Sequence, residues 1–369
     1  MAEDLQKYHL NVTSIERYEG LSSDWITVES SSNETFFLSW NWINNWLESY
    51  SPKVDVLTVR FEGNLVGIAL LCRSEFSQAN RFNSKRLHIN QTGDSRLDQI
   101  WTEYNGILSS IGHEASVRLL MLPYLVSNYA SWDELHVGAV TEELARSMSE
   151  SSGLSRIDMW QSPSYGVNLK RLKDNKLSYL DSLSRNTRYQ IRRSIKLYGS
   201  DGPFALHFAS SQEQAISYFN EIAPFHIAKW GTGEGQSGFT NPHFVKFHKN
   251  LISNTFHLGC IDLIKITSGE RVLGYLYNFI YRDCVYFYLS GLVTENDAKL
   301  KPGLSAHSQV IQHYLDNDFA FYDFMGGDDR YKSSLGEKHA QLYQIALQKN
   351  LAKFKIESCL RKLKGCFNL

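Results

Sequence analysis

The sequence predicts an α/β protein with two tandem domains, each a mixed, mostly antiparallel sheet flanked by helices. The first observation is size: 369 residues with 43% hydrophobic and 13% aromatic side chains can form two packed cores. The second is a pair of β-branched segments with central turns, at 54–75 and 260–282, which are typical of β-hairpins. The third is that their turns, 63–68 and 269–275, match with one inserted residue, which indicates a weak internal repeat.

The second half predicts a strand, two helices, three strands, a helix, a strand, a short helical segment after Gly327 and a last strand. In chain order the ranges are 204–209, 212–230, 242–256, 261–267, 272–281, 285–292, 303–316, 320–325 and, for the last strand, 342–348. The helix 303–316 crosses between two strands and begins next to a strand's C-terminal end. Ligands tend to bind at such a junction, so we expect the site there.

The first half fits the same plan less closely. It predicts a helix, a hairpin, a strand and a helix-strand-helix, at 37–50, 54–75, 86–89 and 117–148. We expect a degenerate N-terminal domain, a basic connecting helix, a C-terminal domain that carries the site and a basic tail, with bounds 1–175, 176–202, 203–350 and 351–369.

Charge and cysteine content exclude several classes of protein. With 38 basic and 39 acidic residues the net charge is -1, so no overall field attracts DNA or an anionic membrane. Five scattered cysteines without a C-x-x-C spacing favour neither disulfides nor zinc, and no H-E-x-x-H occurs, so we expect no metal. No G-x-S-x-G occurs either, which argues against a serine hydrolase. The start lacks a secretory signal and no run of roughly 18 apolar residues occurs, which predicts a cytoplasmic protein.

The connecting segment 180–198 predicts a helix with an apolar stripe and a separate row of cations. Arg185, Arg188, Arg192 and Lys196 form that row, which either is a solvated face or binds phosphates or carboxylates. The basic stretch 353–364 predicts at most a peripheral membrane contact; a docking or disordered tail is the alternative.

The segment 290–306 has the features of a phosphate-binding helix start. Pro302 precedes the first turn, Gly303 allows close approach to the backbone, and free amides with the helix dipole favour an anion. Plain helix capping is the alternative interpretation.

Further along, 321–332 predicts a buried strand that ends in Gly326-Gly327 and a cluster of ionisable side chains. Such a cluster is either a solvated turn or a site at a rigid strand end. In a site, Tyr331 could donate a proton to a leaving group and Asp323 could orient or activate a nucleophile.

His226 and Trp230 stand four residues apart on the helix 212–230 and therefore share a face. A single histidine on such a helix can also be a core residue. The loop 231–238 has no G-x-x-x-x-G-K-[ST] pattern, which argues against a nucleoside triphosphate loop and leaves a mobile loop beside an acceptor site as the interpretation.

The order of elements resembles the acetyltransferase domain of the CelD-type (cellulose-biosynthesis) family of the GNAT superfamily, which is similar in turn to the Fem-type peptidoglycan ligases. The matching residues are Pro302-Gly303, 322–328, Tyr331-Lys332, 103–106, 132–135, Ser184-Arg185-Asn186 with Arg188, Arg192 and Arg193, and His226, Trp230, Phe239 and Phe247. The resemblance spans roughly residues 35 to 348 and is most specific at Tyr331-Lys332.

This resemblance implies two GNAT-like halves, the second of which transfers an acetyl or other acyl group from acyl-CoA to an amine of a sugar or envelope precursor, without a metal. It implies partners in polysaccharide synthesis. In this implied site Tyr331 protonates the thiolate, and His226 or Asp323 takes the amine proton. The residues implied for the cofactor are Leu289, Ser290, Gly291, Pro302, Gly303, Leu304, Ser305 and Ala306, and those for the substrate are Trp230, Phe239, Arg188, Arg192 and Lys332.

One position departs from the superfamily's phosphate loop, which begins with Gln or Arg. Here Leu300 takes that position, ahead of Gly303 and Ser305. Two alternatives therefore stay open: a Fem-type ligase that uses aminoacyl-tRNA, which the arginine row favours, and a non-catalytic binding protein with the same fold.

Overall fold

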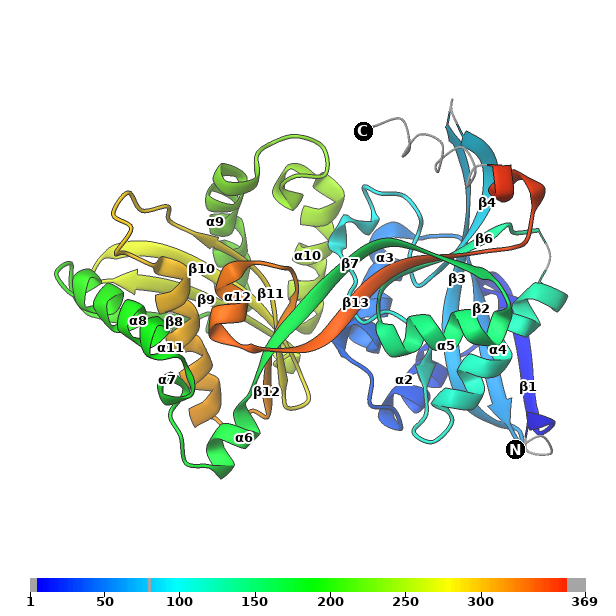
Figure 1. The fold of residues 1–369 in the computed structure, drawn as a ribbon, viewed down its shortest axis with the longest axis horizontal. Coiled ribbons are helices and arrows are strands. Elements are labelled where there is room, and N and C mark those ends of the chain that lie inside the picture. The colour runs from blue at the N-terminus through cyan, green and yellow to red at the C-terminus, as the bar shows by residue number, and fades with distance from the viewer. Residues whose placement is uncertain (1–4, 79–80, 130, 357–369) are drawn as a thin grey trace. The chain divides into compact units, whose positions relative to one another are not determined.

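The computed structural model describes residues 5–78, 81–129 and 131–356, and it divides into two compact units (Figure 1). Unit 1 comprises Met1–Gln161 with Leu342–Leu369, and unit 2 comprises Ser162–Gln341. Over the described ranges, no helix is long and apolar enough to cross a membrane.

Unit 2 has the predicted order of elements. Its sheet runs β7-β12-β11-β10-β9-β8, and only β11 and β12 pair in parallel. The elements are β7 (Ser155–Asn168), α6 (Leu169–Asp174), α7 (Tyr179–Ser182), α8 (Arg185–Tyr198), β8 (Phe204–Phe208), α9 (Gln212–Trp230), α10 (Pro242–Thr255), β9 (Ile261–Ser268), β10 (Arg271–Tyr281), β11 (Cys284–Leu292), α11 (Pro302–Asp316), β12 (Phe321–Gly326), α12 (Arg330–Leu335) and β13 (Glu337–Gln348).

Helices cover both faces of the unit 2 sheet. Successive side chains of a strand point to opposite faces, so each central strand contributes to the packing on both sides. On one face, the ring of Tyr275 contacts Tyr218 of α9, and Tyr277 contacts His248 of α10. On the other face, Leu276 joins the core formed by α8 and α11. We call these the α9 face and the α11 face.

Helix starts in unit 2 carry the expected capping residues. The Ser211 side chain accepts from the Gln214 amide at the start of α9, and Asn241 accepts from the His243 amide ahead of Pro242 in α10. The predicted connecting helix is in fact two helices, because Ser184 caps α8 after the short α7 has ended at Ser182. Leu183 between them is extended.

Unit 1 repeats this topology. Its sheet runs β1-β2-β3-β4-β6-β13, β5 pairs with β3, and β4 and β6 form its parallel pair. Two tandem halves with mixed, mostly antiparallel sheets confirm the predicted fold class. The elements are β1 (Tyr8–Ser14), α2 (Leu21–Ser30), α3 (Trp40–Tyr50), β2 (Val54–Phe61), β3 (Asn64–Gln78), β4 (Arg81–Ile89), β5 (Leu108–Ser109), α4 (Glu114–Asn128), β6 (Glu134–Thr141) and α5 (Glu142–Ser152).

The two halves exchange one strand each. β7 follows α5 of unit 1 but pairs with β12 inside unit 2, whereas β13 follows α12 of unit 2 but pairs with β6 inside unit 1. The unit boundaries therefore fall within β7 and β13, and they differ from the predicted bounds at 175 and 350. The basic tail predicted at 351–369 lies outside the described residues beyond position 356.

Candidate functional site

The parallel strands β11 and β12 of unit 2 pair over only part of their length. Their pairing ends at Tyr286 and Asp323, although β11 continues to Leu292 and β12 to Gly326. Backbone groups of β11 beyond Tyr286 therefore have no ladder with β12. We call this the β11–β12 divergence.

A β-bulge explains why β11 leaves β12 here. In the pairing of β11 with β10, Tyr277 lies opposite Leu289 and Asn278 opposite Phe287, so Tyr288 is an extra residue. A bulge bends its strand and increases the local twist. The Tyr288 hydroxyl and Nε2 of His248 lie 3.0 Å apart, which fixes the bulged side chain on the α9 face.

The start of α11 offers free backbone amides beside the end of β11. Pro302 has no N–H, and the Ser305 amide bonds to the carbonyl oxygen of Lys301, which leaves the amides of Gly303 and Leu304 without an intrahelical acceptor. A methyl group on Gly303 would first meet Leu292, at 3.7 Å. No packed side chain therefore crowds this glycine.

Ser194 of α8 fixes the helix start from behind. Its Oγ accepts from the Lys301 amide and from the Ser305 hydroxyl, both at 2.8 Å. The hydroxyl of Ser305 and the buried Ala306 thus belong to the packing of α11. Of the predicted cofactor-binding residues on this helix, Gly303 and Leu304 have amides free for an anion.

Tyr331 of α12 lies next to α11. Its ring stacks on that of His307, with centroids 5.6 Å apart and planes at 18°, and His307 stands one helical turn after Gly303. Burial, and then the charge of Asp329, raises the pKa of Tyr331 well above its usual value. Its hydroxyl makes no hydrogen bond to another described residue, so it can donate a proton to a ligand.

His307 is a neutral buried side chain that supports Tyr331. Its Nδ1 lies 3.2 Å from the Tyr322 hydroxyl, and its ring is edge-on to Phe287. Burial, followed by the charges of Lys332 and Lys229, lowers the pKa of His307 to about 3. Sequence reasoning missed His307; its position four residues after Gly303 was the available signal.

Lys332 was predicted to bind substrate, but its ammonium group is used inside the fold. Nζ donates to the carbonyl oxygens of Gly326, at 2.6 Å, and Met325, at 3.3 Å, and the residue is buried. It thereby ties α12, and with it Tyr331, to the end of β12.

Asp323 lies on the opposite strand face from Tyr322 and Phe324, which contact His307. Its Oδ1 accepts from the Met325 amide, at 2.6 Å, and from the Ser164 hydroxyl, at 3.1 Å. Met325 has a left-handed backbone conformation, with φ of 61°, that this carboxylate stabilises. The structure therefore separates Asp323 from Tyr331 and gives it a role in shaping β12.

His226 lies on the face of α9 that packs on β11. A methyl group at Gly291 would come within 2.7 Å of the Ile222 carbonyl oxygen, so this glycine allows the close approach of α9. Ile222 and His226 share a face at i, i+4 spacing. His226 Nδ1 lies 2.8 Å from the Ser237 hydroxyl, and burial, then the Lys229 charge, lowers the pKa of His226 to about 4.

The other predicted substrate residues lie in two groups. Phe239 packs on His226 with ring centroids 5.4 Å apart, and Trp230 is 48% exposed beside the same histidine. Arg188 and Arg192 lie on α8, which packs on the α11 face, and Arg188 donates to the Asp181 carbonyl oxygen. The arginines thus lie apart from the His226 group.

The equivalent position in unit 1 is filled by the chain itself. The parallel pairing of β4 and β6 ends at His88 and His136. Beyond this pairing the Asn90 side chain donates to the carbonyl oxygen of Gly106. The Asn105 side chain donates to the carbonyl oxygen of Ile89, and the Asn105 backbone amide donates to the carbonyl oxygen of Ala139. These buried amides occupy the strand ends of unit 1.

One family model matches part of unit 2. Residues 185–333 match the family model described as an acetyltransferase (GNAT) domain. This match covers less than half of the chain. No curated protein sequence shows a significant match. Over residues 185–333 the chain is therefore similar to a GNAT acetyltransferase domain.

Solved structures share the fold at low sequence identity. FemX has a TM-score of 0.54 at 10% identity, with 88% of this chain and 96% of that chain covered. A conserved protein of unknown function from Bacteroides thetaiotaomicron has a TM-score of 0.53 at 9% identity, covering 90% and 99%. A third structure is the C-terminal domain of an Agrobacterium fabrum protein assigned as a lysylphosphatidylglycerol synthetase. Its TM-score is 0.50 at 9% identity, with 92% of this chain and 95% of that chain covered.

Proposed function

We propose that unit 2 is an N-acyltransferase that moves an acetyl or other acyl group from acyl-CoA to an amine of a sugar or envelope precursor. The observation that carries this proposal is the β11–β12 divergence, with the free amides of Gly303 and Leu304 at the start of α11 and the ring of Tyr331 stacked on His307 of the same helix. A narrow thioester arm can pair with the open edge of β11, and a diphosphate suits the helix start.

In this reaction the amine nitrogen attacks the thioester carbonyl, the C–S bond breaks, and the amide forms. Tyr331 gives its proton to the departing thiolate, for which a phenol that stays protonated at neutral pH is suited. The surplus amine proton passes to a base and then to solvent. The enzyme contributes by holding both substrates and by placing these two groups.

His226 suits the base role better than Asp323 does. With its pKa lowered to about 4, its imidazole is neutral at pH 7 and can accept a proton. Asp323 is already an acceptor for several donors within the fold. Trp230 and Phe239 beside His226 would contact the acceptor.

The proposal is tested by incubating the purified protein with acetyl-CoA and a panel of amino sugars while free thiol is measured. Amine-dependent thiol release supports it. If CoA does not bind and aminoacyl-tRNA is consumed instead, the Fem-type alternative replaces it; CoA binding with no turnover on any amine favours a non-catalytic binding protein, with proteins of polysaccharide synthesis as its partners.

A further inference from the structure

Helix α8 of unit 2 concentrates positive charge. Its 14 residues, Arg185–Tyr198, include no Asp or Glu. The cations are Arg185, Arg188, Arg192, Arg193 and Lys196. The whole chain, in contrast, has a net charge of -1. We call these five cations, together with Tyr189 among them, the basic face of α8.

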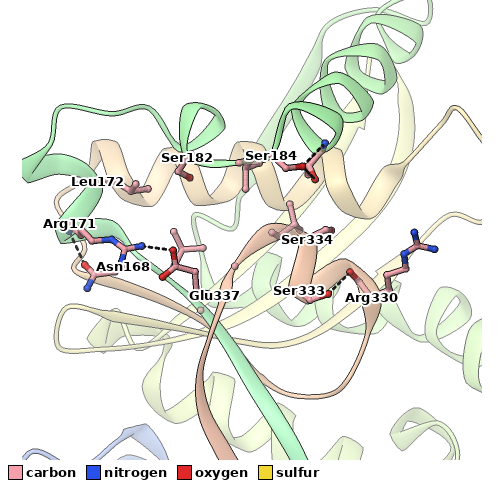
Figure 2. Close-up of a pocket in the computed structure, with 15 residues that line it drawn as sticks. Asn168, Arg171, Leu172, Ser182, Ser184, Arg330, Ser333, Ser334 and Glu337 are labelled. Atoms are coloured by element: carbon pink, nitrogen blue, oxygen red, sulfur yellow. Dashed lines mark hydrogen bonds and ion pairs between the residues drawn. The ribbon is translucent and has the colours of Figure 1, made fainter.

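The basic face is distinct from the side of α8 that packs on the core. The buried residues of the helix are Thr187, Ile191, Ser194 and Tyr198. Ser184, which caps α8, and Thr187 line a cavity of about 380 Å³ at the start of the helix (Figure 2). None of the five cations lines that cavity. The basic face therefore belongs to neither the core nor the cavity.

Neighbouring acids do not neutralise the basic face. Within the described part of the chain, none of its five cations makes an ion pair, and Arg188 donates only to a backbone carbonyl oxygen. The Nε atom of Arg193 is buried without a hydrogen-bond partner among the same residues. Glu295, which accepts from Tyr198 at the end of α8, pairs with Arg271 instead. The positive charge of this face is therefore available to an external anion.

This arrangement of charge disfavours the helix itself. Arg188, Arg192 and Lys196 follow one another at four-residue spacing, so like charges lie next to each other along the helix surface. Arg185 places a further cation in the first turn, where the helix dipole favours an anion. A face that is merely solvated would gain stability from an acid at any of these positions. An anionic partner explains why the helix carries only cations.

Apolar side chains are exposed among the cations. Tyr189 is 59% exposed and stands about 200° around the helix from the buried Ile191, at the centre of the exposed side. Leu197, on the flank of the same side, is 39% exposed. A lipid headgroup layer accommodates both kinds of side chain, because its phosphates attract cations and its interface accepts tyrosine rings and leucine. An RNA would pair with the cations and stack on Tyr189, but it offers no apolar layer for Leu197.

We propose that the basic face of α8 docks unit 2 onto an anionic lipid surface. Clusters of about four to eight Lys and Arg on an amphipathic helix are typical of proteins that bind anionic lipids. In the docked state, lipid phosphates lie against the guanidinium groups and the Tyr189 ring enters the headgroup layer. This proposal does not depend on acyl transfer.

Co-sedimentation of the full chain with lipid vesicles tests the proposal. The probes are vesicles of equal parts phosphatidylglycerol and phosphatidylcholine, and vesicles of phosphatidylcholine alone. We expect the anionic vesicles to bind at least about tenfold more tightly, and added salt to weaken that binding. Replacing Arg185, Arg192 and Lys196 together with Gln should weaken binding to the anionic vesicles by about 100-fold, since each cation near the surface contributes roughly a factor of five.

A matched variant separates the basic face from the total charge. Replacing Lys246, Lys249 and Lys338 together with Gln removes the same charge from α10 and β13, and should keep vesicle binding within about twofold. The α8 variant should melt at the same temperature as the unmodified protein or higher, because repulsion within the helix is removed. Its loss of binding is then not a loss of folding.

Tyr189→Ser tests the apolar part of the contact. It should weaken binding to the anionic vesicles by about tenfold, and by the same factor in low and moderate salt, because burial of the ring is not screened. The proposal is overturned if the anionic vesicles do not bind, or if the control variant weakens binding as much as the α8 variant does. It is also overturned if the protein binds a transfer RNA but not the vesicles.

Discussion

The ring of Tyr331 stacks on the ring of His307, with centroids 5.6 Å apart, although the two residues belong to different helices. His307 is in turn held by the Tyr322 hydroxyl of β12 and by contact with Phe287 of β11. The side chain that we propose as the proton donor is therefore positioned by both diverging strands. Any change in their separation should alter the position of this hydroxyl.

Replacing Tyr331 with Phe should slow amine-dependent thiol release by about one to four orders of magnitude, because the proton donor is lost while the stacking on His307 stays. Stopped or continuous thiol assays measure this rate. The dissociation constant for CoA should stay within about twofold of that of the unmodified protein. An unchanged rate would remove Tyr331 from the mechanism.

Acid should destabilise unit 2 through its buried histidines. The pKa of His307 is lowered to about 3 from an ordinary 6.5 by burial first, so below pH 6.5 the unfolded chain binds a proton that the folded chain does not. The free energy of unfolding therefore keeps its full value with respect to His307 above pH 6.5. It falls as the pH is lowered towards 3, by up to about 1.4 kcal/mol per pH unit. Urea unfolding at several pH values measures the slope of the free energy of unfolding against pH, which reports the number of protons taken up on unfolding. His307→Gln should lower that number by one.

Lys332→Met should lower the free energy of unfolding by about 1 to 3 kcal/mol, because the carbonyl oxygens of Met325 and Gly326 lose their donor. Lys338→Met, at an exposed position of β13, is the control and should change it by less than about 0.5 kcal/mol. Equal effects in the two variants would contradict a structural role for Lys332.

Two glycines should respond in opposite ways to alanine. Gly291→Ala should cost about 1 to 3 kcal/mol of stability, because its methyl group meets the backbone of α9 at 2.7 Å. Gly303→Ala has room and should keep or slightly raise stability. It should nevertheless weaken CoA binding by about tenfold, because the methyl group impedes approach to the helix start. Gly303→Ala that binds CoA normally would show that no ligand approaches these amides.

The elements of unit 2 could be predicted because their signals are local. The predicted helix 212–230 coincides with α9, and most other predicted ends differ by a few residues or less, since capping residues such as Ser211 and Asn241 mark them. The strand exchange could not be predicted. Periodicity identifies β7 and β13 as strands at most, and their partners β12 and β6 are chosen by contacts far away in the sequence.

The candidate site was predicted in part. The free amides at Gly303 and Leu304 follow from the Pro-Gly helix start, whereas the role of Tyr331 stays a prediction. Lys332 and Asp323 were predicted as site residues because charged side chains lie in and after an apolar strand. The sequence does not reveal that Lys332 donates to the Gly326 carbonyl oxygen, or that Asp323 accepts from the Met325 amide. His307 was missed because its sequence signal, a position four residues after Gly303, does not by itself separate a site residue from a core residue.

The most direct test of this account is a crystal structure of the protein with CoA. The account predicts that the pantetheine arm lies along β11 between Tyr288 and Gly291, with the diphosphate on the amides of Gly303 and Leu304 and the sulfur within hydrogen-bonding distance of the Tyr331 hydroxyl. CoA bound elsewhere, or strands β11 and β12 closed by side chains with CoA present in excess, would contradict it.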